Sequence, residues 1–294
     1  MTLSDTQRLQ LAHRSVRRFV DRPLETGQLE TLIRCGQAAA SSSFIQAYSV
    51  VRVTDPEDRA VIAAAAGGQQ WIERAAEFLV FCADLRRVDA ACAHAGAGHL
   101  EGYAEHGLAA IVDVTLMAQN VLLAAESQGL GGVFIGGIRN EPEVLVDRLR
   151  LPALVLPVFG MCLGWPDQET EVKPRLPTAL VLHQDRYTDP QAAQIQAYDE
   201  TMAAYYAARS GNNRLSDWRT NSLYERQVHS RTSMLADSVR TRAAGVLIAD
   251  PKPLQQHAHG DEIAVFEATG GIPHRRRRRL ADPRDQAHSS ACVG

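Results

Sequence analysis

The segment from His13 to Phe19, HRSVRRF, gathers three arginines, a histidine and a serine within seven residues near the start of the chain. Arginine presents a planar fork of N–H groups that matches phosphate geometry, and Ser15 and His13 add shorter donors. Val16 and Phe19 are apolar and can anchor this backbone in a core. These residue types predict a site for a phosphate-bearing ligand; the alternative is an exposed basic turn with solvated arginines.

Three further segments carry side chains or backbone suited to ligand binding. Ser41–Ser43 presents three consecutive hydroxyls, which either donate to a ligand or form a plain solvent loop. Gly129–Gly137 is a short apolar strand bracketed by paired glycines, where a ligand can approach the backbone closely. Lys173-Pro-Arg175 is a basic turn whose proline fixes the backbone.

Helical and alternating hydrophobic patterns follow one another along the chain, which predicts an α/β or α+β layer structure. The predicted helices cover residues 25–39, 57–66, 108–128, 142–149 and 191–208. The predicted strands cover residues 48–54, 77–83, 129–137 and 156–166.

The segment 108–128 is apolar on nearly every face, which predicts a helix buried all round, at a subunit interface if not in the core. It is not expected to span a membrane. Asp113, Gln119, Asn120 and Glu126 interrupt it, and its apolar runs are shorter than the roughly 20 residues that a bilayer requires.

Composition restricts the class of function. The 294 residues are 45% hydrophobic and 22% charged, and the net charge of −3 argues against the whole chain binding nucleic acid or a membrane surface. No signal peptide is visible, so we expect a cytoplasmic location. The five cysteines form no C-x-x-C pair, which predicts reduced thiols, the first four being packing residues or inert.

The tail from residue 246 has no sustained period and a nearly balanced charge, so we expect residues 246–294 to be mostly disordered. Its run Arg275–Arg279 leaves open a remote alternative, a non-catalytic nucleic-acid binder, although such runs are usually solvated.

Six motifs, in order along the chain, resemble the nitroreductase superfamily, and more narrowly its branch of oxygen-insensitive NADPH nitroreductases and flavin reductases. They are His13–Arg17, Ser41–Ser43, Gly67–Gln69, Phe134–Gly137, Gly164–Pro166 and Lys173–Pro177. The resemblance covers residues 8–245, which predicts one catalytic domain over 1–245 and leaves 246–294 without a counterpart. It implies an α+β fold, with a central, mostly antiparallel sheet wrapped by helices, and an intertwined homodimer with FMN at the interface.

The resemblance also implies roles for single residues toward FMN. The phosphate and ring edge would be held by His13, Arg14, Ser15, Val16 and Arg17, with Lys173 and Arg175 completing the cradle. Ser41, Ser42 and Ser43 would reach the flavin from the partner subunit. Gln69 would bond its polar edge, and Phe134, Ile135, Gly136 and Gly137 would run along the ring, Phe134 standing where the family often has tyrosine.

For the electron donor, the resemblance implies that Arg209, Arg214 and Arg231 bind the 2′-phosphate of NADPH; the alternative is ordinary surface arginine. Paired arginines can distinguish NADPH from NADH because only NADPH carries that dianion. Leu215 stands where the family has a second basic residue beside Arg214, which weakens this selectivity.

The implied activity is a ping-pong, two-electron reduction of nitroaromatics, quinones or related electron-poor small molecules, with NADPH as donor and FMN carrying the chemistry. No catalytic side chain and no metal are expected. One alternative is an NAD(P)H flavin reductase that supplies reduced FMN. Another is a metal hydrolase built on Cys92, His94, His99 and His106, whose spacings do not place ligands on one helix face.

Overall fold

The computed structural model describes residues 2–102, 104–209, 216–220 and 222. The helices are α1 (Asp5–Leu11), α2 (Gln28–Gln37), α3 (Pro56–Ala65), α4 (Trp71–Arg74), α5 (Arg86–His94), α6 (Ala104–Ser127), α7 (Pro142–Arg148) and α8 (Ala192–Ala208). The 3-10 turns are η1 (Ser42–Phe44), η2 (Gly136–Arg139) and η3 (Thr178–Leu180). The strands are β1 (Tyr48–Arg52), β2 (Glu77–Asp84), β3 (Gly131–Ile135) and β4 (Val155–Gly164). The predicted helices and strands are confirmed, with ends shifted by a few residues.

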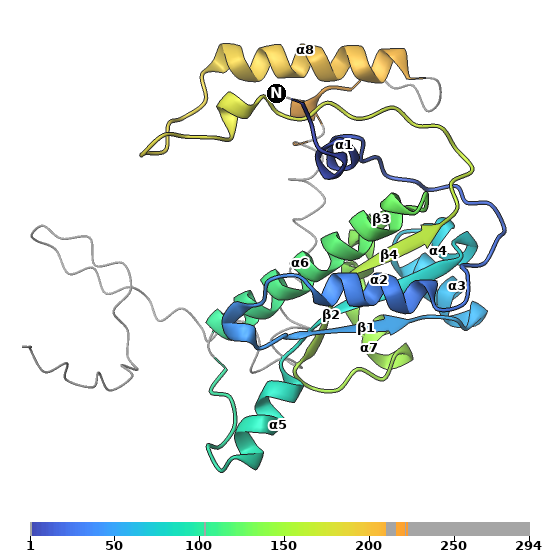
Figure 1. Ribbon diagram of the computed structural model, residues 1–294, viewed down its shortest axis with the longest axis vertical. Coiled ribbons are helices and arrows are strands. Elements are labelled where there is room, and N and C mark those ends of the chain that lie inside the picture. Colours follow the sequence, from blue (N-terminus) through green and yellow to red (C-terminus); the bar gives the residue numbers. More distant parts are fainter. Residues whose placement is uncertain (1, 103, 210–215, 221, 223–294) are drawn as a thin grey trace, which may run out of the picture. The chain divides into compact units, whose positions relative to one another are not determined.

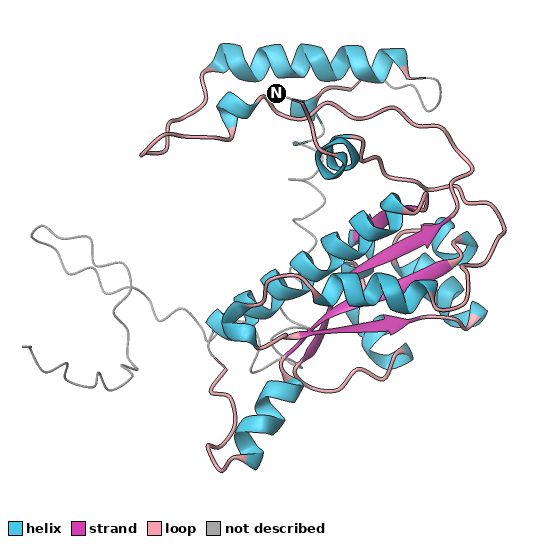
Figure 2. Ribbon diagram, viewed as in Figure 1, coloured by secondary structure: helices cyan, strands magenta, loops and turns pink. Residues whose placement is uncertain are grey.

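The four strands form one sheet in the order β1-β2-β4-β3, and every neighbouring pair is antiparallel (Figure 2). β2 lies inside the sheet and is buried along its whole length, which explains its unbroken apolar sequence. The antiparallel pairing confirms the α+β class.

Helices cover both faces of this sheet (Figure 1). Phe78 and Val80 of β2 pack with α3, α4 and α7 on one face. Leu79 and Phe81, which alternate with them, pack with α2 and α6 on the other. The strand period of two thus divides the core into two apolar layers.

Within the single described chain, α6 is buried along one face only, so the expected burial all round is reached inside this chain on that face alone. Leu108, Val112 and Leu116, one turn apart, are 57%, 42% and 43% exposed. α6 is long and apolar enough to span a membrane by length and composition, but half of its most apolar window is buried inside the protein. It serves as a core helix with one apolar stripe facing out.

α8 packs away from the sheet against the segment that follows β4. Tyr198, Met202 and Tyr206 form a separate apolar cluster with Leu176. The Tyr198 hydroxyl donates to the carbonyl of Pro174 at 3.0 Å. This contact fixes α8 on the turn that carries Lys173 and Arg175.

The cysteines of the described residues are free thiols, as expected. Cys82 and Cys162 are buried packing residues, and burial raises the pKa of the Cys82 thiol to about 12 and that of Cys162 further still. These two thiols are inert at neutral pH. Cys35 is exposed and so is not a packing residue, and the other predicted role, an inert thiol, stays a prediction for it.

Asp113 of α6 is a fully buried carboxylate that fixes the serine loop. It accepts hydrogen bonds from the Ser41 hydroxyl at 2.6 Å, from the Ser42 N–H at 2.7 Å and from the Ala47 N–H at 3.2 Å. Asp113, one of the polar residues that interrupt the apolar helix, therefore offsets the free-energy cost of burying its charge by accepting three hydrogen bonds.

We expect Asp113→Ala to lower the free energy of unfolding by roughly 3 kcal/mol, because one buried and two partly buried donors lose their acceptor. Urea denaturation measures this change. The matched control is Asp189→Ala, at an exposed aspartate, which should change stability by less than about 0.5 kcal/mol. Equal effects of the two substitutions would contradict a structural role for Asp113.

Candidate functional site

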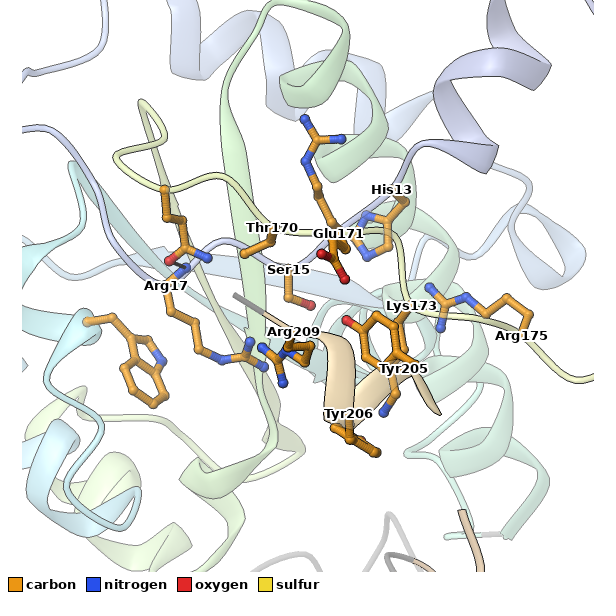
Figure 3. A pocket seen from close by; sticks show the side chains of 13 residues that line it. His13, Ser15, Arg17, Thr170, Glu171, Lys173, Arg175, Tyr205, Tyr206 and Arg209 are labelled. Atoms are coloured by element: carbon orange, nitrogen blue, oxygen red, sulfur yellow. Dashed lines mark hydrogen bonds between the residues drawn. The ribbon is translucent and has the colours of Figure 1, made fainter. Parts of the chain in front are cut away.

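A cleft of about 660 Å³ lies between the segment after α1, the segment after β4 and the end of α8 (Figure 3). Its lining residues are mostly basic, hydroxyl-bearing or aromatic. They are His13, Arg14, Ser15, Arg17, Trp71, Gln168, Thr170, Glu171, Lys173, Arg175, Tyr205, Tyr206 and Arg209. The structure therefore brings together the N-terminal motif and the Lys-Pro-Arg turn, more than 150 residues apart.

The first wall of the cleft is an extended segment anchored by Val16. The Val16 side chain is 4% exposed, and its N–H donates to the carbonyl of Gly132 in β3 at 2.9 Å. A Cβ at Gly131 would lie 2.5 Å from a Val16 methyl carbon, so only glycine permits this close packing. With Val16 in the core, its neighbours Ser15 and Arg17 line the cleft.

The second wall is joined to the first by the side chain of Gln168. Its Oε1 accepts from the backbone N–H of Arg17 at 3.1 Å and of Arg18 at 2.7 Å. The Arg18 guanidinium in turn donates to the carbonyl of Asp167 at 2.8 Å. These bonds hold residues 167–168 against the N-terminal motif, so the two walls of the cleft keep a fixed spacing.

Three cations of the cleft each lie near an aromatic ring, with 5.3 to 5.8 Å between the charged group and the ring centroid. The pairs are Arg17 with Trp71, Lys173 with Tyr206, and Arg209 with Tyr205. A cation at this distance from an aromatic face is attracted by about 0.5–1 kcal/mol or more. The rings therefore hold the long basic side chains in place before any ligand arrives.

The charge of the cleft is strongly positive. Partial burial, and secondarily repulsion from Arg209, lower the pKa of the Arg17 guanidinium from its ordinary value. Arg17 still carries its charge at neutral pH, because arginine is not deprotonated in proteins. A bound anion would relieve this repulsion.

His13 is oriented by a buried carboxylate. Its Nδ1 lies 2.6 Å from Oε1 of Glu126, whose side chain is 11% exposed. A carboxylate at Nδ1 favours the tautomer that carries a proton there and leaves Nε2 for a ligand. Glu126, which the sequence shows only as a polar interruption of an apolar helix, thus positions a cleft residue.

Two buried donors that belong to the cleft residues have no partner within the described part of the chain. They are the indole N–H of Trp71 and the hydroxyl of Thr170. Together with the guanidinium and ammonium groups, they form a donor set suited to a phosphate and its attached polar chain. FMN, a phosphate monoester on a ribityl chain, fits this chemistry.

The predicted serines lie apart from the cleft, in η1 beside α6. The Ser41 hydroxyl is engaged by Asp113 and also accepts the Gln46 N–H at 2.7 Å. Ser43 and Phe44 adopt left-handed backbone conformations, with φ of 47° and 58°, and Phe44 is 80% exposed. Non-glycine residues in this region are strained and cluster at binding sites. The predicted contact with a partner's flavin stays a prediction.

The predicted glycine strand forms a third group, at the end of β3 next to Gln69. The Gln69 amide donates to the Ala66 carbonyl at 2.8 Å. A Cβ at Gly137 would lie 2.4 Å from both that carbonyl and the Gln69 amide nitrogen. Phe134 is 37% exposed, whereas Ile135 is buried. Gln69 and Gly137 are therefore neighbours, as they must be if both contact the same flavin.

Of the residues predicted for NADPH, Arg209 lines the same cleft as the predicted FMN cradle. Arg214 and Arg231 lie outside the described residues, as does the tail 246–294. The metal-hydrolase alternative gains no support, because the described ranges contain no group of three or more residues that could hold a metal ion. His99 instead pairs with Asp89, at 2.9 Å.

The residues that line the cleft but were not predicted from the sequence as site residues are Trp71, Gln168, Thr170, Glu171, Tyr205 and Tyr206. Trp71 lies two positions after Gln69, a predicted site residue, and this nearness only weakly indicates a role in ligand binding. Gln168 and Thr170 sit in a polar segment without periodicity, so neither type nor spacing distinguishes them from loop residues. Their roles depend on tertiary contacts.

Comparisons with known proteins match most of the described chain. The profile of the nitroreductase family matches residues 11–165, and that of its C-terminal domain matches residues 173–240. The NADPH-flavin oxidoreductase of Vibrio harveyi is 50% identical over 210 residues, which cover 71% of this chain and 85% of the relative. The oxygen-insensitive NADPH nitroreductase of Salmonella typhimurium is 44% identical, with 74% and 88% covered.

Solved structures agree with these sequence matches. Nitroreductase A from Vibrio parahaemolyticus superposes with a TM-score of 0.75 at 43% identity, covering 82% of this chain and 98% of that one. The NADPH:FMN oxidoreductase from Vibrio harveyi, complexed with NAD+, gives a TM-score of 0.73 at 43% identity, with 81% and 98% covered.

We expect Gly137→Ala to destabilise the fold by about 1–3 kcal/mol, because its Cβ would collide with the Ala66 backbone. Gly136→Ala is the matched control, since its Cβ would meet only the flexible end of Arg139, at 3.1 Å. Urea denaturation compares the two variants. The packing argument fails if Gly136→Ala loses as much stability as Gly137→Ala.

Proposed function

Because the chain belongs to the nitroreductase family, we propose that it is an FMN-dependent NADPH oxidoreductase that reduces nitroaromatics, quinones or related electron-poor small molecules. The observation that carries the proposal is the cleft where the His13–Arg17 motif meets Lys173 and Arg175. Relatives at 39% to 50% identity are named NADPH nitroreductase, NADPH-flavin oxidoreductase and FMN reductase (NADPH).

The bound flavin supplies two-electron hydride chemistry, and the protein supplies binding and orientation. Arg17, Lys173 and Arg175 hold the phosphate by charge-assisted hydrogen bonds. His13 is held at the cleft by Glu126, whose carboxylate lies at its Nδ1. The polar edge of the flavin is bonded by Gln69, and the backbone of Phe134–Gly137 runs along the ring. No side chain has to act as a general acid or nucleophile.

NADPH is the proposed donor, with Arg209 pairing its 2′-phosphate. Arg209 is held near the ring of Tyr205 and lines the same cleft as Arg17. A further cation in the same cleft suits a second phosphate dianion. Arg214 and Arg231 keep their proposed part in this site.

A second candidate function is reduction of free flavin. It is favoured by the 50% identity to a relative named NADPH-flavin oxidoreductase. The two functions share cofactor, donor and cleft, and differ only in the acceptor. Steady-state rates with FMN as acceptor, compared with rates on a nitroaromatic, distinguish them.

We further propose that the enzyme is a homodimer in which α6 and the serine loop contact the partner. The outward stripe of Leu108, Val112 and Leu116 supports this, because a row of exposed apolar residues on a helix is typical of an interface. The exposed Phe44 beside Ser41–Ser43 extends the same argument to the loop. The partner's flavin is the proposed ligand of those serines.

A cytoplasmic location and a catalytic domain over residues 1–245 complete the proposal. Free thiols among the described cysteines are consistent with a reducing compartment. The second of the two family profiles ends at residue 240, before the atypical tail of residues 246–294. No membrane or nucleic-acid partner is proposed.

Purified protein is expected to be yellow, with flavin absorption that NADPH bleaches and a nitroaromatic restores under nitrogen. Absorption spectroscopy on the full chain tests cofactor, donor and acceptor together. A colourless protein that cannot be reconstituted with FMN would contradict the proposed function. Bleaching by NADPH without recovery on adding the nitroaromatic would instead favour the flavin reductase.

We expect Leu116→Glu to convert a dimer of the 32.1 kDa chain into monomers, because it buries a carboxylate in the proposed apolar interface. Sedimentation velocity measures the mass of each form. The control Ala64→Glu adds the same charge at an exposed position of α3 and should leave the dimer intact. A monomeric wild type, or a Leu116→Glu variant that stays dimeric, would refute the assignment of this face.

A further inference from the structure

We propose that the Thr170 hydroxyl is a phosphate-binding group of the cleft, by which the protein selects a phosphorylated flavin over an unphosphorylated one. The inference rests on the FMN function proposed above and adds a residue to it. Neither the HRSVR motif nor the Lys-Pro-Arg turn includes this position.

The first argument is the unsatisfied state of the hydroxyl. Thr170 lines the cleft, and its Oγ1 is buried without a hydrogen-bond partner in the described part of the chain. Leaving a buried hydroxyl unpaired is unfavourable, and most such groups in proteins have partners. A phosphate oxygen placed in the cleft would accept this hydrogen bond and remove the penalty.

The second argument is the place of Thr170 in the chain. It lies between Gln168, which binds the backbone of Arg17 and Arg18, and Lys173, which lines the same cleft. The segment that carries the hydroxyl is joined to the N-terminal motif through Gln168 and leads into Lys173, which lines the same cleft as Thr170 (Figure 3). The hydroxyl therefore belongs to the phosphate end of the site.

The third argument is electrostatic. Six basic side chains already line the cleft, and partial burial, followed by the nearness of Arg209, lowers the pKa of Arg17. A neutral donor adds a hydrogen bond to the phosphate without adding to this repulsion in the empty cleft. Hydroxyl donors such as Thr170 and Ser15 suit a site already crowded with positive charge.

The test compares Thr170→Val, which removes the hydroxyl and keeps the shape, with Thr170→Ser, which keeps the hydroxyl. Thr178→Val, at an exposed threonine of η3, is the matched control. Full-length protein freed of flavin is titrated with FMN and with riboflavin, which lacks the phosphate, and flavin fluorescence gives each Kd. Thermal unfolding of the flavin-free proteins is measured in parallel.

We expect Thr170→Val to weaken FMN binding about tenfold, the loss of one hydrogen bond to a charged group, and to leave riboflavin binding unchanged. Thr170→Ser and Thr178→Val should bind both flavins as the wild type does. The flavin-free Thr170→Val protein should unfold at the same temperature as the wild type or higher, because it loses a hydroxyl that had no partner.

Three results would overturn the inference: an unchanged FMN Kd in Thr170→Val, an equal loss for FMN and riboflavin, or a lower unfolding temperature of the flavin-free variant. If Thr170→Val does not fold, Thr170→Ala carries the same comparison of FMN with riboflavin. A wild-type protein that binds neither flavin would instead refute the proposed function, so the two failures are distinguishable.

Discussion

The concentration of positive charge in one cleft is the constraint on which the rest of the site depends. His13, Arg14, Arg17, Lys173, Arg175 and Arg209 line it, and of the described lining residues only Glu171 is acidic. Like charges repel in the empty site, so the fold must hold them together by other means. It does so with the buried Val16 anchor, the Gln168 bridge and three aromatic rings. The repulsion between these charges lowers the stability of the empty fold, and a bound phosphate removes that repulsion, which strengthens its binding.

The antiparallel sheet and its helices bring together the two segments that form the cleft, although these segments lie far apart in the sequence. β3 provides the carbonyl that fixes Val16, and the strand next to it, β4, leads directly into the segment with Gln168 and Lys173. α8 then holds the second segment through Tyr198 and Tyr206. None of these hydrogen bonds uses a basic side chain, so the charged groups of the cleft stay available for a ligand.

Much of the fold could be predicted from hydrophobic period, because residues 48–54 alternate as in a strand and Leu29, Leu32 and Ile33 recur at the spacing of a helix. The meeting of His13–Arg17 with Lys173 and Arg175 came from family resemblance, since no local pattern links segments so far apart. Gln168 and Thr170 could not be found because their roles arise only from tertiary neighbours. Hydropathy cannot tell burial inside one chain from burial against another, so the sequence left open which of the two applies to the outward face of α6.

The Gln168 bridge also bears on how the protein acquires its flavin. The hydrogen bonds from Arg17 and Arg18 to Gln168 span about 150 positions of sequence, and the cleft is incomplete until they form. Contacts of such high sequence separation are entropically slow to close and come late in folding. During synthesis, the N-terminal motif leaves the ribosome long before its other half is made. FMN therefore joins a nearly finished fold rather than nucleating it, and flavin content reports on chains that have completed folding.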